Sequence, residues 1–509
     1  MQTSTPLSLS ARLRAVAAVD PQHWALEQDE ARLTWSDLVR VADGLEAAAK
    51  SAGLPANACI CVIVRNALAS AAGLVGVLMG ARPVVYVSGV HAEEKRVEEI
   101  ASLRPAMLVG GPGDLTPATV AAVAGYGGVA ASIGADGAVS LDSKTLRAGA
   151  GPFYEPEPGT ALAMRTSGTT GAPKLICLSR SIVEEGMREG TRGKDGGERL
   201  PEKIARSPTL LFAPMFHASG TFALLLSIYE GRPVVVFDKF KVDTLRSALA
   251  RYPVRLVSLP PTVLRMVIDS DLEPEALKSV LAVRSGTAPL DPRVQEAFET
   301  RFGVPVLITY GATEFMGALA RWTIEDHKAF AAAKRGSVGK VSPGVDLRIV
   351  DAETGAPQPA DGVGLLEVRG SRVGSETWVR TNDLARLDAD GFLWILGRAD
   401  DAIIRGGFKV LAGEVARALE DHPAVGEAAV IGLPDERLGE VPVAVVEPRE
   451  GVTAPTPAEL TAFARARLAP YQVPAEILVV EKLPRTVSLK VSRPDVRALF
   501  ATRRDPATA

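Results

Sequence analysis

Cysteine is scarce in this chain, and its placement excludes two kinds of architecture. Only three cysteines occur in 509 residues, at Cys59, Cys61 and Cys177. Two of them stand in the apolar run ACICVIV, which is typical of reduced residues in a buried strand. A disulfide framework or a zinc site would need more cysteines at suitable spacing, so the sequence predicts neither. We expect a cytoplasmic location.

Long hydrophobic runs and an excess of positive charge are also missing. The longest apolar run, residues 67–81, is rich in Ala and Gly and shorter than a bilayer requires, so it predicts a buried helix. The N-terminus has no apolar segment ahead of a small-residue cleavage site, and we expect no signal peptide. Lys and Arg number 57 against 60 Asp and Glu, and this balance excludes an electrostatic footprint for nucleic acid.

The first 150 residues alternate predicted helices and strands. Residues 34–54 have helical spacing, a Thr/Ser cap signal at the start and Gly53 near the end. The strand ACICVIV, the helix at 67–81 and the strand RPVVYVS follow. Strand, helix and strand in succession imply a parallel sheet with both faces covered. We therefore expect an α/β fold.

The later part of the chain changes character twice. Residues 184–203, dense in Gly and charge, are predicted to form an exposed loop. Beyond residue 335, alternating apolar and polar residues broken by Gly, Pro and Asp turns predict a β-rich subdomain. A compact α+β unit follows, and its boundary falls near Asp400.

The segment MRTSGTTGAPK, residues 164–174, has the composition of a polyphosphate-binding loop. Glycine lets backbone N–H groups approach an anion, hydroxyls donate to phosphate oxygens, and Lys174 supplies a positive charge. Pro173 favours extended backbone before it, so the loop should run into the strand LICLS rather than into a helix. A Ser- and Gly-rich surface turn is the alternative interpretation.

Three further strands are predicted to end in turns of small residues. These turns cover 217–220, 285–289 and 310–314. Because ligands bind at the carboxyl ends of strands in open sheets, we expect the turns and the phosphate loop to meet at one sheet edge. His217 stands at such a strand end, although a histidine between apolar residues is often structural.

The last of these turns, YGATE, offers three useful groups. Tyr310 provides a ring for base stacking, and Thr313 provides a hydroxyl. Glu314 provides a carboxylate that suits Mg²⁺ beside phosphates. Asp383, in TNDLARLD, is predicted to lie at a turn.

Taken in order, the motifs resemble those of the adenylate-forming superfamily, which includes acyl-CoA synthetases, luciferases and nonribosomal peptide adenylation domains. The resemblance covers nearly the whole chain and rests on TSGTTGAPK, PMFHASG, SGTAPL, YGATE, GSVGK, TNDLARLD, GRADDAIIRGGFKV and LPRTVSLK. It implies a large N-terminal domain (1–398) and a small C-terminal domain (399–509) that rotates. It also implies two half-reactions, in which ATP and Mg²⁺ convert a carboxylic acid to acyl-AMP and a thiol such as coenzyme A then displaces AMP.

The resemblance assigns roles to individual residues of the large domain. The β- and γ-phosphates would be bound by the loop residues Thr166, Ser167, Gly168, Thr169, Thr170, Gly171 and Lys174. The adenine site would be lined by the turns at 285–289 and 310–314, through Gly286, Thr287, Ala288, Tyr310 and Gly311. Thr313 would reach the α-phosphate and Glu314 would hold Mg²⁺.

Further roles fall to residues near the end of the chain. Asp383 would accept hydrogen bonds from the ribose hydroxyls, with Arg398 supporting that contact, and Asp400 matches the hinge. Lys490 matches the adenylation lysine. The Gly406–Gly407 pair would line the thiol tunnel.

The acid itself would lie against residues without charge. The proposed lining comprises His217, which is also a catalytic candidate, with Ala218, Ser219, Gly220, Leu259 and Phe315. This lining favours an apolar acid that is aromatic, alicyclic or of medium chain length. We expect no membrane span and no nucleic-acid partner, and a homodimer is left open.

Three departures from the family pattern bear on the activity. Leu489 replaces the usual Gly before the final lysine, Asn382 replaces Gly in TGDL, and the segment between VRG and VRTND is short. The sequence predicts an AMP-forming acid–CoA ligase, because GGFKV resembles the CoA-using branch. The alternatives are an acyl-adenylate former that loads a carrier protein, and a protein limited to one half-reaction or to nucleotide binding. The intact Lys174 and Lys490 argue against the last.

Overall fold

The computed structural model describes residues 7–166, 174–191, 200–486 and 490–504. Contacts within the chain define two compact units. The first combines Met1–Asp346 with Arg369–Thr377, and the second combines Leu347–Val368 with Trp378–Ala509. The predicted boundary between residues 398 and 399 falls inside the second unit and stays a prediction.

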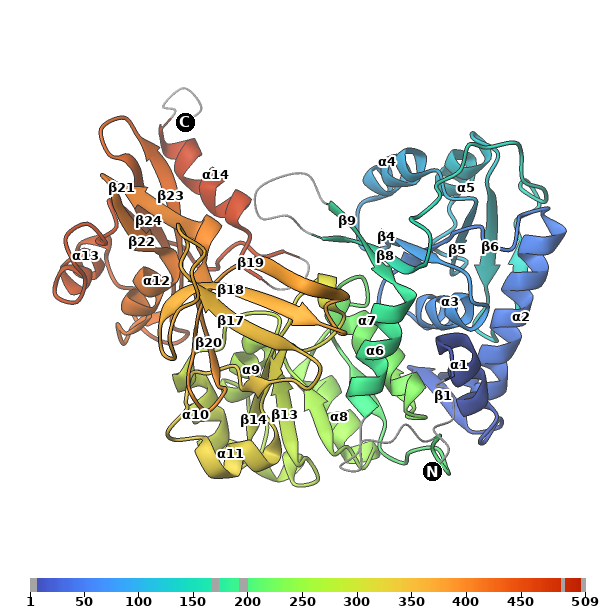
Figure 1. Cartoon of the computed structure of the whole chain (residues 1–509), viewed down its shortest axis with the longest axis horizontal. Coiled ribbons are helices and arrows are strands. Elements are labelled where there is room, and N and C mark those ends of the chain that lie inside the picture. Colours follow the sequence, from blue (N-terminus) through green and yellow to red (C-terminus); the bar gives the residue numbers. More distant parts are fainter. Residues whose placement is uncertain (1–6, 167–173, 192–199, 487–489, 505–509) are drawn as a thin grey trace. The chain divides into compact units, whose positions relative to one another are not determined.

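A seven-stranded sheet forms the core of the first unit (Figure 1). Its strands are β3 (Ile60–Val64), β4 (Val84–Ser88), β5 (Met107–Gly110), β6 (Val129–Ile133), β7 (Val139–Leu141), β8 (Thr160–Thr166) and β9 (Lys174–Ser179). They run in the order β7-β6-β5-β3-β4-β8-β9, with antiparallel strands only at the two edges. The predicted parallel sheet is therefore confirmed.

Helices cover both faces of this sheet. They are α1 (Leu9–Ala17), α2 (Trp35–Ser51), α3 (Leu68–Met79), α4 (Glu93–Leu103) and α5 (Pro117–Ala124). In β3, Ile60, Val62 and Val64 pack with α1 to α3, whereas Cys61 and Ile63 pack with α4 and α5. This alternation buries both faces of the strand, as its unbroken apolar sequence requires.

The cysteines behave as the sequence predicts. All three are free, and Cys59 and Cys61 are buried. Burial raises the pKa of the Cys59 thiol to about 12, because the thiolate would lose its hydration. These cysteines therefore pack as small apolar residues.

Helix α2 shows how local sequence sets an element. Thr34 caps its N-terminus by accepting from the Asp37 N–H, and the Asp37 carboxylate accepts from the Thr34 N–H, which completes a capping box. Gly53 follows the helix with a φ of +82°, a conformation that favours glycine. The predicted start and stop are both confirmed.

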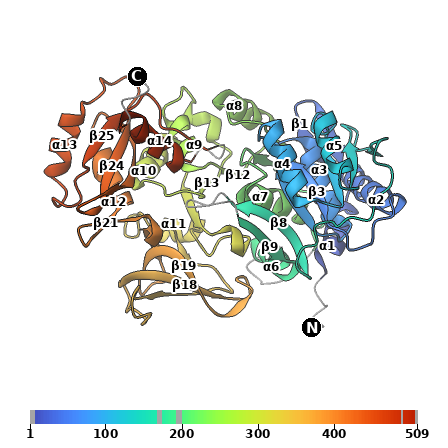
Figure 2. The same ribbon diagram turned by 90° about the horizontal axis from the view of Figure 1, so that it is seen from above.

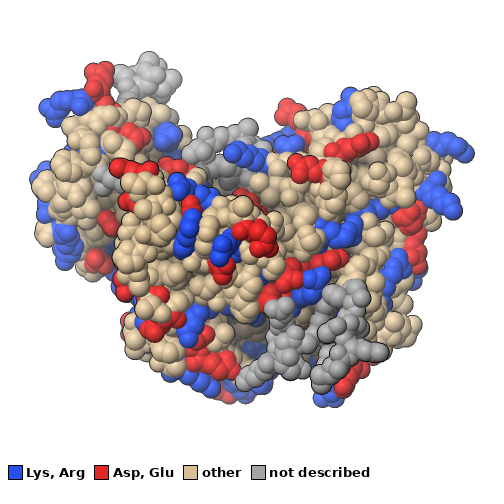
Figure 3. All heavy atoms as spheres, viewed as in Figure 1, with Lys and Arg blue, Asp and Glu red and all other residues tan. Residues whose placement is uncertain are grey.

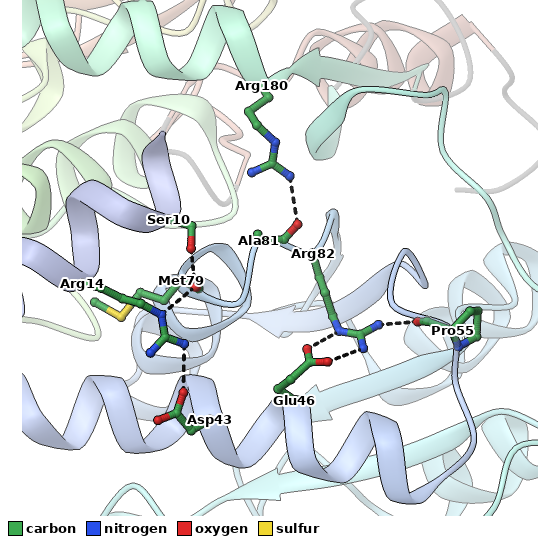
Figure 4. Close-up of polar contacts among 9 residues, drawn as sticks. All are labelled: Ser10, Arg14, Asp43, Glu46, Pro55, Met79, Ala81, Arg82 and Arg180. Carbon is green, nitrogen blue, oxygen red and sulfur yellow. Dashed lines mark hydrogen bonds and ion pairs between the residues drawn. The ribbon is translucent and has the colours of Figure 1, made fainter. Parts of the chain in front are cut away.

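Donors from distant segments satisfy the carbonyl groups at the C-terminal end of α3 (Figure 4). The Met79 carbonyl accepts from Ser10 Oγ at 2.6 Å and from Arg14 Nε at 3.1 Å. Arg180 Nη2 donates to the Ala81 carbonyl at 2.9 Å. Two guanidinium groups thus lie where the helix dipole favours positive charge.

Arg82, just beyond α3, is a buried cation with a full set of partners (Figure 4). Its Nε and Nη2 donate to the two carboxylate oxygens of Glu46 at 2.6 and 2.8 Å, and its Nη1 donates to the Pro55 carbonyl at 2.6 Å. A bidentate pair of this kind compensates the desolvation of the guanidinium.

Two smaller sheets complete the first unit. One contains β1 (Trp24–Gln28), β2 (Ala31–Thr34), β10 (Thr209–Leu211) and β11 (Val234–Val236), in the order β10-β11-β1-β2. The other runs through β12 (Leu256–Ser258), β13 (Ala282–Ser285), β14 (Val306–Tyr310), β15 (Ala320–Arg321) and β16 (Lys340–Val341). The remaining helical segments are α6 (Arg180–Thr191), α7 (Ala218–Tyr229), α8 (Val242–Arg251), α9 (Pro261–Ile268), η1 (Pro274–Leu277), α10 (Pro292–Phe302), η2 (Thr313–Phe315) and α11 (Ile324–Phe330).

Helix α6 corrects a sequence prediction. Residues 184–191 were expected in an exposed loop, but they form the second half of α6, and Gly186, Met187 and Glu189 are buried. A Cβ on Gly186 would lie 2.4 Å from the Met316 carbonyl oxygen. The glycine therefore serves close packing of a helix and does not mark a loop.

The second unit combines a four-stranded and a five-stranded sheet. The first sheet contains β17 (Asp346–Val350), β18 (Val363–Gly370), β19 (Ser375–Leu387) and β20 (Leu393–Arg398). The second contains β21 (Ala402–Arg405), β22 (Phe408–Leu411), β23 (Val425–Asp435), β24 (Gly439–Pro448) and β25 (Glu476–Val479). Helical segments are η3 (Ala399–Asp401), α12 (Ala412–Glu420), α13 (Pro457–Arg465) and α14 (Arg493–Arg504). Helix α12 packs on β23. Helix α13 packs on β25, and Figure 2 shows these two elements from above.

On the face drawn in Figure 3, acidic and basic residues are interspersed. Among the described helices, none combines the length and apolar character that a membrane crossing requires. The mixed α/β class, the β-rich region and the α+β C-terminal part are confirmed.

Candidate functional site

The candidate phosphate loop connects two antiparallel strands. β8 ends at Thr166 and β9 begins at Lys174, and these two residues are cross-strand partners. The loop therefore runs into a strand, as predicted from Pro173. Lys174 is exposed. The expected phosphate ligands Ser167, Gly168, Thr169, Thr170 and Gly171, and the Thr166 side chain, lie outside the described residues.

The turn after β13 approaches the neighbouring strand closely. A Cβ on Gly286 would lie 2.6 Å from Thr309 Oγ1 and 3.0 Å from the Thr309 carbonyl oxygen. Thr287 follows with a φ of +71°, which is uncommon for a residue other than glycine, and its side chain is exposed. The turn Gly286–Ala288 thus keeps its backbone close to β14.

The turn after β14 carries the candidate metal ligand. A Cβ on Gly311 would lie 2.2 Å from the Gly317 carbonyl oxygen, so only glycine fits there. Thr313 and Glu314 open the 3₁₀ turn η2, with Thr313 half-buried and Glu314 exposed. Met316 closes it in the left-handed region, at a φ of +41°.

His217 lies at the start of a helix rather than in a turn, which corrects the prediction for residues 217–220. It is the N-cap of α7, and Ala218, Ser219 and Gly220 form the first helical turn. A Cβ on Gly220 would lie 2.3 Å from the Pro214 carbonyl oxygen. The half-buried His217 ring packs against Phe216, with 4.4 Å between ring centroids.

Asn66 fixes this helix start, and sequence analysis missed it. Its Oδ1 accepts from the Met215 N–H at 2.8 Å, and its Nδ2 lies 2.9 Å from the Phe237 carbonyl and 3.2 Å from the Ala213 carbonyl. The residue is 5% exposed. An Asn two residues after the end of the apolar strand β3 was the available signal, but nothing in the sequence places it beside residue 215.

The candidate residues come together from three sheets, so the prediction of a single sheet edge is wrong. Only the turns after β13 and β14 share an edge, because these are adjacent parallel strands. β10, which precedes His217, and β8–β9 belong to the other two sheets. Packing brings them together: β9 contacts η2, β10 contacts β12, and α6 contacts α7.

Three of the proposed acid-lining residues are buried, and Gly220 of α7 is one of them. Leu259 is 0% exposed and packs among β12, β13 and α9. Phe315 is 6% exposed. The accessible part of the proposed lining is therefore the start of α7.

A resident metal centre does not fit the described part of the chain, but a nucleotide-borne cation does. No group of three or more His, Cys, Asp or Glu side chains is assembled there for a metal ion. Glu314 offers one exposed carboxylate. Mg²⁺ needs only one or two protein carboxylates when phosphates supply its other ligands, so this donor fits a magnesium nucleotide.

In the second unit, Asp383 and Arg398 are cross-strand partners on β19 and β20. Asp383 therefore lies inside a strand, and its prediction at a turn is wrong. Arg398 makes a bidentate ion pair with Asp400, with Nε–Oδ1 at 2.9 Å and Nη2–Oδ2 at 3.0 Å. Hydrogen bonding to Arg398 lowers the pKa of Asp400, and the same bond raises the pKa of Arg398. Arg398, at the end of β20, therefore fixes the carboxylate of Asp400, the expected hinge residue.

Lys490 lies next to an isolated antiparallel bridge. Its carbonyl accepts from the Thr486 N–H at 2.7 Å, and Arg485 pairs with Val491. Leu489 lies outside the described residues. Lys490 keeps an exposed surface, and partial burial by surrounding chain lowers the pKa of its ammonium group below the ordinary value.

Gly406 and Gly407 form the two-residue turn of the β21–β22 hairpin. Their φ values are +57° and +86°, the positive pair that such tight hairpins use. No atom lies within 4 Å of a Cβ built on Gly407. Phe408, which follows, is 57% exposed and stacks on Tyr471 at 4.7 Å.

Family models match the two parts of the chain in order. The model described as AMP-binding enzyme matches residues 13–378, and the model described as AMP-binding enzyme C-terminal domain matches residues 414–490.

Similar curated proteins include two named CoA ligases. A 2-succinylbenzoate–CoA ligase of Bacillus velezensis is 34% identical over 354 residues, covering 66% of this chain and 68% of that protein. An indoleacetate–CoA ligase of Aromatoleum aromaticum is 28% identical over 523 residues, covering 98% of this chain and 99% of its own length.

Similar solved structures share the fold over nearly the whole chain. ATP-bound MatB from Rhodopseudomonas palustris gives a TM-score of 0.81 at 22% identity, covering 97% of this chain and all (100%) of that one. The o-succinylbenzoate CoA synthetase of Bacillus subtilis, in complex with its acyl-adenylate, gives 0.75 at 24% identity, covering 97% and 99%.

Proposed function

The chain belongs to the AMP-binding enzyme family and is an acid–thiol ligase of that family, and we propose that it converts an apolar carboxylic acid to its coenzyme A thioester. The carboxylate of the acid first attacks the α-phosphate of ATP, which gives an acyl-AMP and releases pyrophosphate. The thiol of coenzyme A then attacks the acyl carbon and releases AMP. The contact between β9 and η2 carries this proposal, because it brings the strand that begins with Lys174 against the turn that holds Thr313 and Glu314.

The first half-reaction is limited by charge. A carboxylate must approach the anionic α-phosphate, and the leaving pyrophosphate gains negative charge as the bond to it breaks. In our proposal Lys174 neutralises the β- and γ-phosphates, Glu314 holds Mg²⁺ against them, and Thr313 donates to the α-phosphate. Lys490 supplies a further ammonium group during adenylation. Groups of this kind lower the barrier because they are fixed where charge develops.

The nucleoside half of ATP would use neutral surfaces and one carboxylate. We assign the adenine to the turn Gly286–Ala288 and to Tyr310 with Gly311, where Thr287 is exposed and the backbone is held close to β14. Asp383 would accept from the ribose hydroxyls. Since Arg398 is engaged with Asp400, it would support Asp383 by position and charge.

The acid would lie along the start of α7. His217, Ala218 and Ser219 are accessible there, and none brings a fixed charge. The named substrates of the two similar ligases, 2-succinylbenzoate and indoleacetate, contain aromatic rings. We therefore favour an acid with an aromatic, alicyclic or medium-chain apolar body.

We assign the thiol step to the C-terminal part of the chain. Residues 399–509 would turn about Asp400 after adenylation and present the Gly406–Gly407 hairpin turn to the thiol. The open space around Gly407 supports this role, since a pantetheine arm must pass close to backbone. Delivery of the acyl group to a carrier protein instead of coenzyme A is the second candidate.

One pair of assays tests the proposal. A panel of carboxylic acids is screened by acid-dependent ATP–pyrophosphate exchange and, separately, by formation of the CoA thioester. We expect at least one acid to support both reactions. Exchange without thioester would favour a carrier-protein acceptor, whereas thioester formation only from synthetic acyl-AMP would limit the enzyme to the second half-reaction. Failure of both reactions across the panel would refute the proposal.

A further inference from the structure

Arg372 is a buried cation with very few partners. It lies in Arg369–Thr377, the segment between β18 and β19 that packs within the first unit, and it is 2% exposed. Its Nη1 donates to the Ala318 carbonyl at 2.7 Å. Its Nε has no hydrogen-bond partner. Among the described residues, no carboxylate oxygen lies within 4.0 Å of a guanidinium nitrogen of Arg372, the distance that defines an ion pair. Arg82, by contrast, is as deeply buried and fully paired.

The charges around Arg372 compensate it incompletely. Burial lowers the pKa of its guanidinium, and the positive charge of Arg321 acts in the same direction. The negative charges of Glu189 and Glu185 on α6, which lie beyond ion-pair distance, act to raise this pKa. The pKa of Arg372 nevertheless stays below its ordinary value. A desolvated cation without a close anion destabilises a folded protein, so this position has a cost that one carbonyl contact does not offset.

The guanidinium lies beside the turn that follows Glu314. A Cβ built on Gly317 would be 2.4 Å from Arg372 Nη2 and 3.4 Å from Cε2 of Phe222. The absence of a side chain at Gly317 is therefore what admits the guanidinium to this place. Phe222 marks the same location from the side of α7.

Helix geometry relates this location to the acid. Phe222 follows Ser219 by three residues and Ala218 by four, so the three side chains share one face of α7. One turn of helix, about 5.4 Å, separates them along the axis. An acid that starts against Ala218 and Ser219 and extends along this face reaches Phe222, with Arg372 adjacent.

We propose that Arg372 is a specificity residue that pairs with an anionic group at the end of the acid remote from the reacting carboxylate. The preferred substrate would then have an apolar body and a second carboxylate. This inference rests on the proposed function, since it takes the acid to lie along α7. A guanidinium presents parallel N–H donors that match a carboxylate, and a substrate without that group would leave the buried cation unpaired.

The test uses acids in matched pairs that differ only in the second carboxylate. Suitable pairs are hexanoate with adipate, octanoate with suberate, and phenylacetate with 4-carboxyphenylacetate. For each acid, kcat/KM for pyrophosphate exchange is measured in the wild type, Arg372→Met and Arg372→Lys. Arg369→Met is the matched control, because Arg369 lies on the same segment with a 42% exposed side chain that pairs with Asp346.

We expect the wild type to favour the dicarboxylate by tenfold or more in at least one pair. Arg372→Met should lower kcat/KM for that dicarboxylate by more than thirtyfold and change its monocarboxylate partner by less than threefold. Arg372→Lys, which keeps the charge, should restore part of the preference, and Arg369→Met should leave it unchanged. Equal losses for both members of every pair, or a wild type that favours the monocarboxylate throughout, would overturn the inference.

A binding measurement separates this inference from the proposed function. Calorimetric titration of the wild type, Arg372→Met and Arg372→Lys with the same acids needs no turnover. Dicarboxylate binding that Arg372→Met weakens tenfold or more supports the inference even if no acid is adenylated, in which case the proposed function alone fails. The inference would be refuted if the wild type and both variants bound every dicarboxylate with equal affinity. It would also be refuted if Arg372→Met did not fold while Arg372→Lys kept the acid preference of the wild type unchanged.

Discussion

The two units hold their candidate residues by different physical means. In the first unit, backbone segments approach so closely at two positions that only glycine fits: a Cβ would lie 2.3 Å from a carbonyl oxygen at Gly220 and 2.2 Å from one at Gly311. In the second unit, side-chain ion pairs hold the candidate residues in position. Arg398 holds Asp400, and Arg493 pairs with Asp401.

The difference teaches which perturbations each unit can absorb. A steric fit fails abruptly when one methyl group is added, and it responds little to pH or salt. A partly exposed ion pair weakens gradually with salt and with protonation, and each pair contributes little. In the first unit, a substitution that adds a single methyl group at one of these positions should therefore abolish activity. Substitutions in the second unit should instead slow one half-reaction and spare the other.

The largest effect is expected for Gly311→Ala. The new Cβ must displace the Gly317 carbonyl and, with it, the turn that holds Thr313 and Glu314. We expect pyrophosphate exchange to fall more than a hundredfold and the free energy of unfolding to drop by about 2 kcal/mol or more.

Gly113→Ala is the control for this change, because no atom lies within 4 Å of a Cβ there. It should leave both exchange and the denaturation midpoint unchanged. Normal exchange in Gly311→Ala would mean that the β14 turn does not hold reacting groups.

Lys490→Ala should separate the half-reactions. Loss of a positioned ammonium group should slow acyl-AMP formation about a hundredfold, which corresponds to about 3 kcal/mol of transition-state stabilisation. Thioester formation from synthetic acyl-AMP should continue, and the denaturation midpoint should stay within a degree or so because Lys490 is exposed. Equal loss of both steps would contradict the assignment.

Gly407→Leu should give the opposite separation. The turn has open space but a φ of +86°, so a leucine strains the backbone modestly while its side chain occupies the proposed path of the thiol. We expect exchange within about threefold of wild type and a loss of more than tenfold in CoA thioester formation, a barrier change of over about 1.4 kcal/mol.

Gly451→Leu is the matched control for backbone strain, since Gly451 also has a positive φ, +75°, and open surroundings. It should leave thioester formation unchanged. If Gly407→Leu behaves like this control, the thiol does not enter past the β21–β22 turn.

The smallest effect concerns the pH dependence of Asp400. Its folded-state pKa is lowered by Arg398, so the ion pair stabilises the folded state above the unfolded pKa of about 3.9 and loses this contribution as the pH falls through the lower folded value. Asp400→Asn should reduce the free energy of unfolding by less than about 1 kcal/mol at pH 6. The difference from wild type should shrink as the pH falls below the unfolded pKa of about 3.9, and it should also shrink in 1 M salt. A difference that is independent of pH would exclude the ion pair as its cause.

The sequence predicts elements well where a local rule decides them. The capping box at Thr34, the stop at Gly53 and the apolar run of β3 each contain their own signal within a few residues. The strand after Pro173 follows equally from local geometry. In each case the structure agrees, since no distant partner is needed to choose the conformation.

The failures arise where a distant contact decides. Residues 184–191 read as a loop because glycines and charges alternate there, yet Gly186 and Gly190 let α6 pack on the Met316 carbonyl and on Leu226. The distribution of strand ends over three sheets depends on long-range pairing that periodicity does not encode. Asn66 was missed for the same reason, because its partners lie about 150 residues further along the chain.

The pairing of β1 with β11 has a consequence for synthesis of the protein. Leu26 is the ladder partner of Val234, so β1 leaves the ribosome some two hundred residues before the strand with which it pairs. At about 5–20 residues per second this interval lasts roughly ten to forty seconds, during which β1 has an unpaired edge. The charged side chains of Glu27 and Arg32 on the β1–β2 hairpin oppose edge-to-edge association with other chains in that period. Nascent chains stalled before residue 234 should therefore depend on chaperones more than chains stalled just after it.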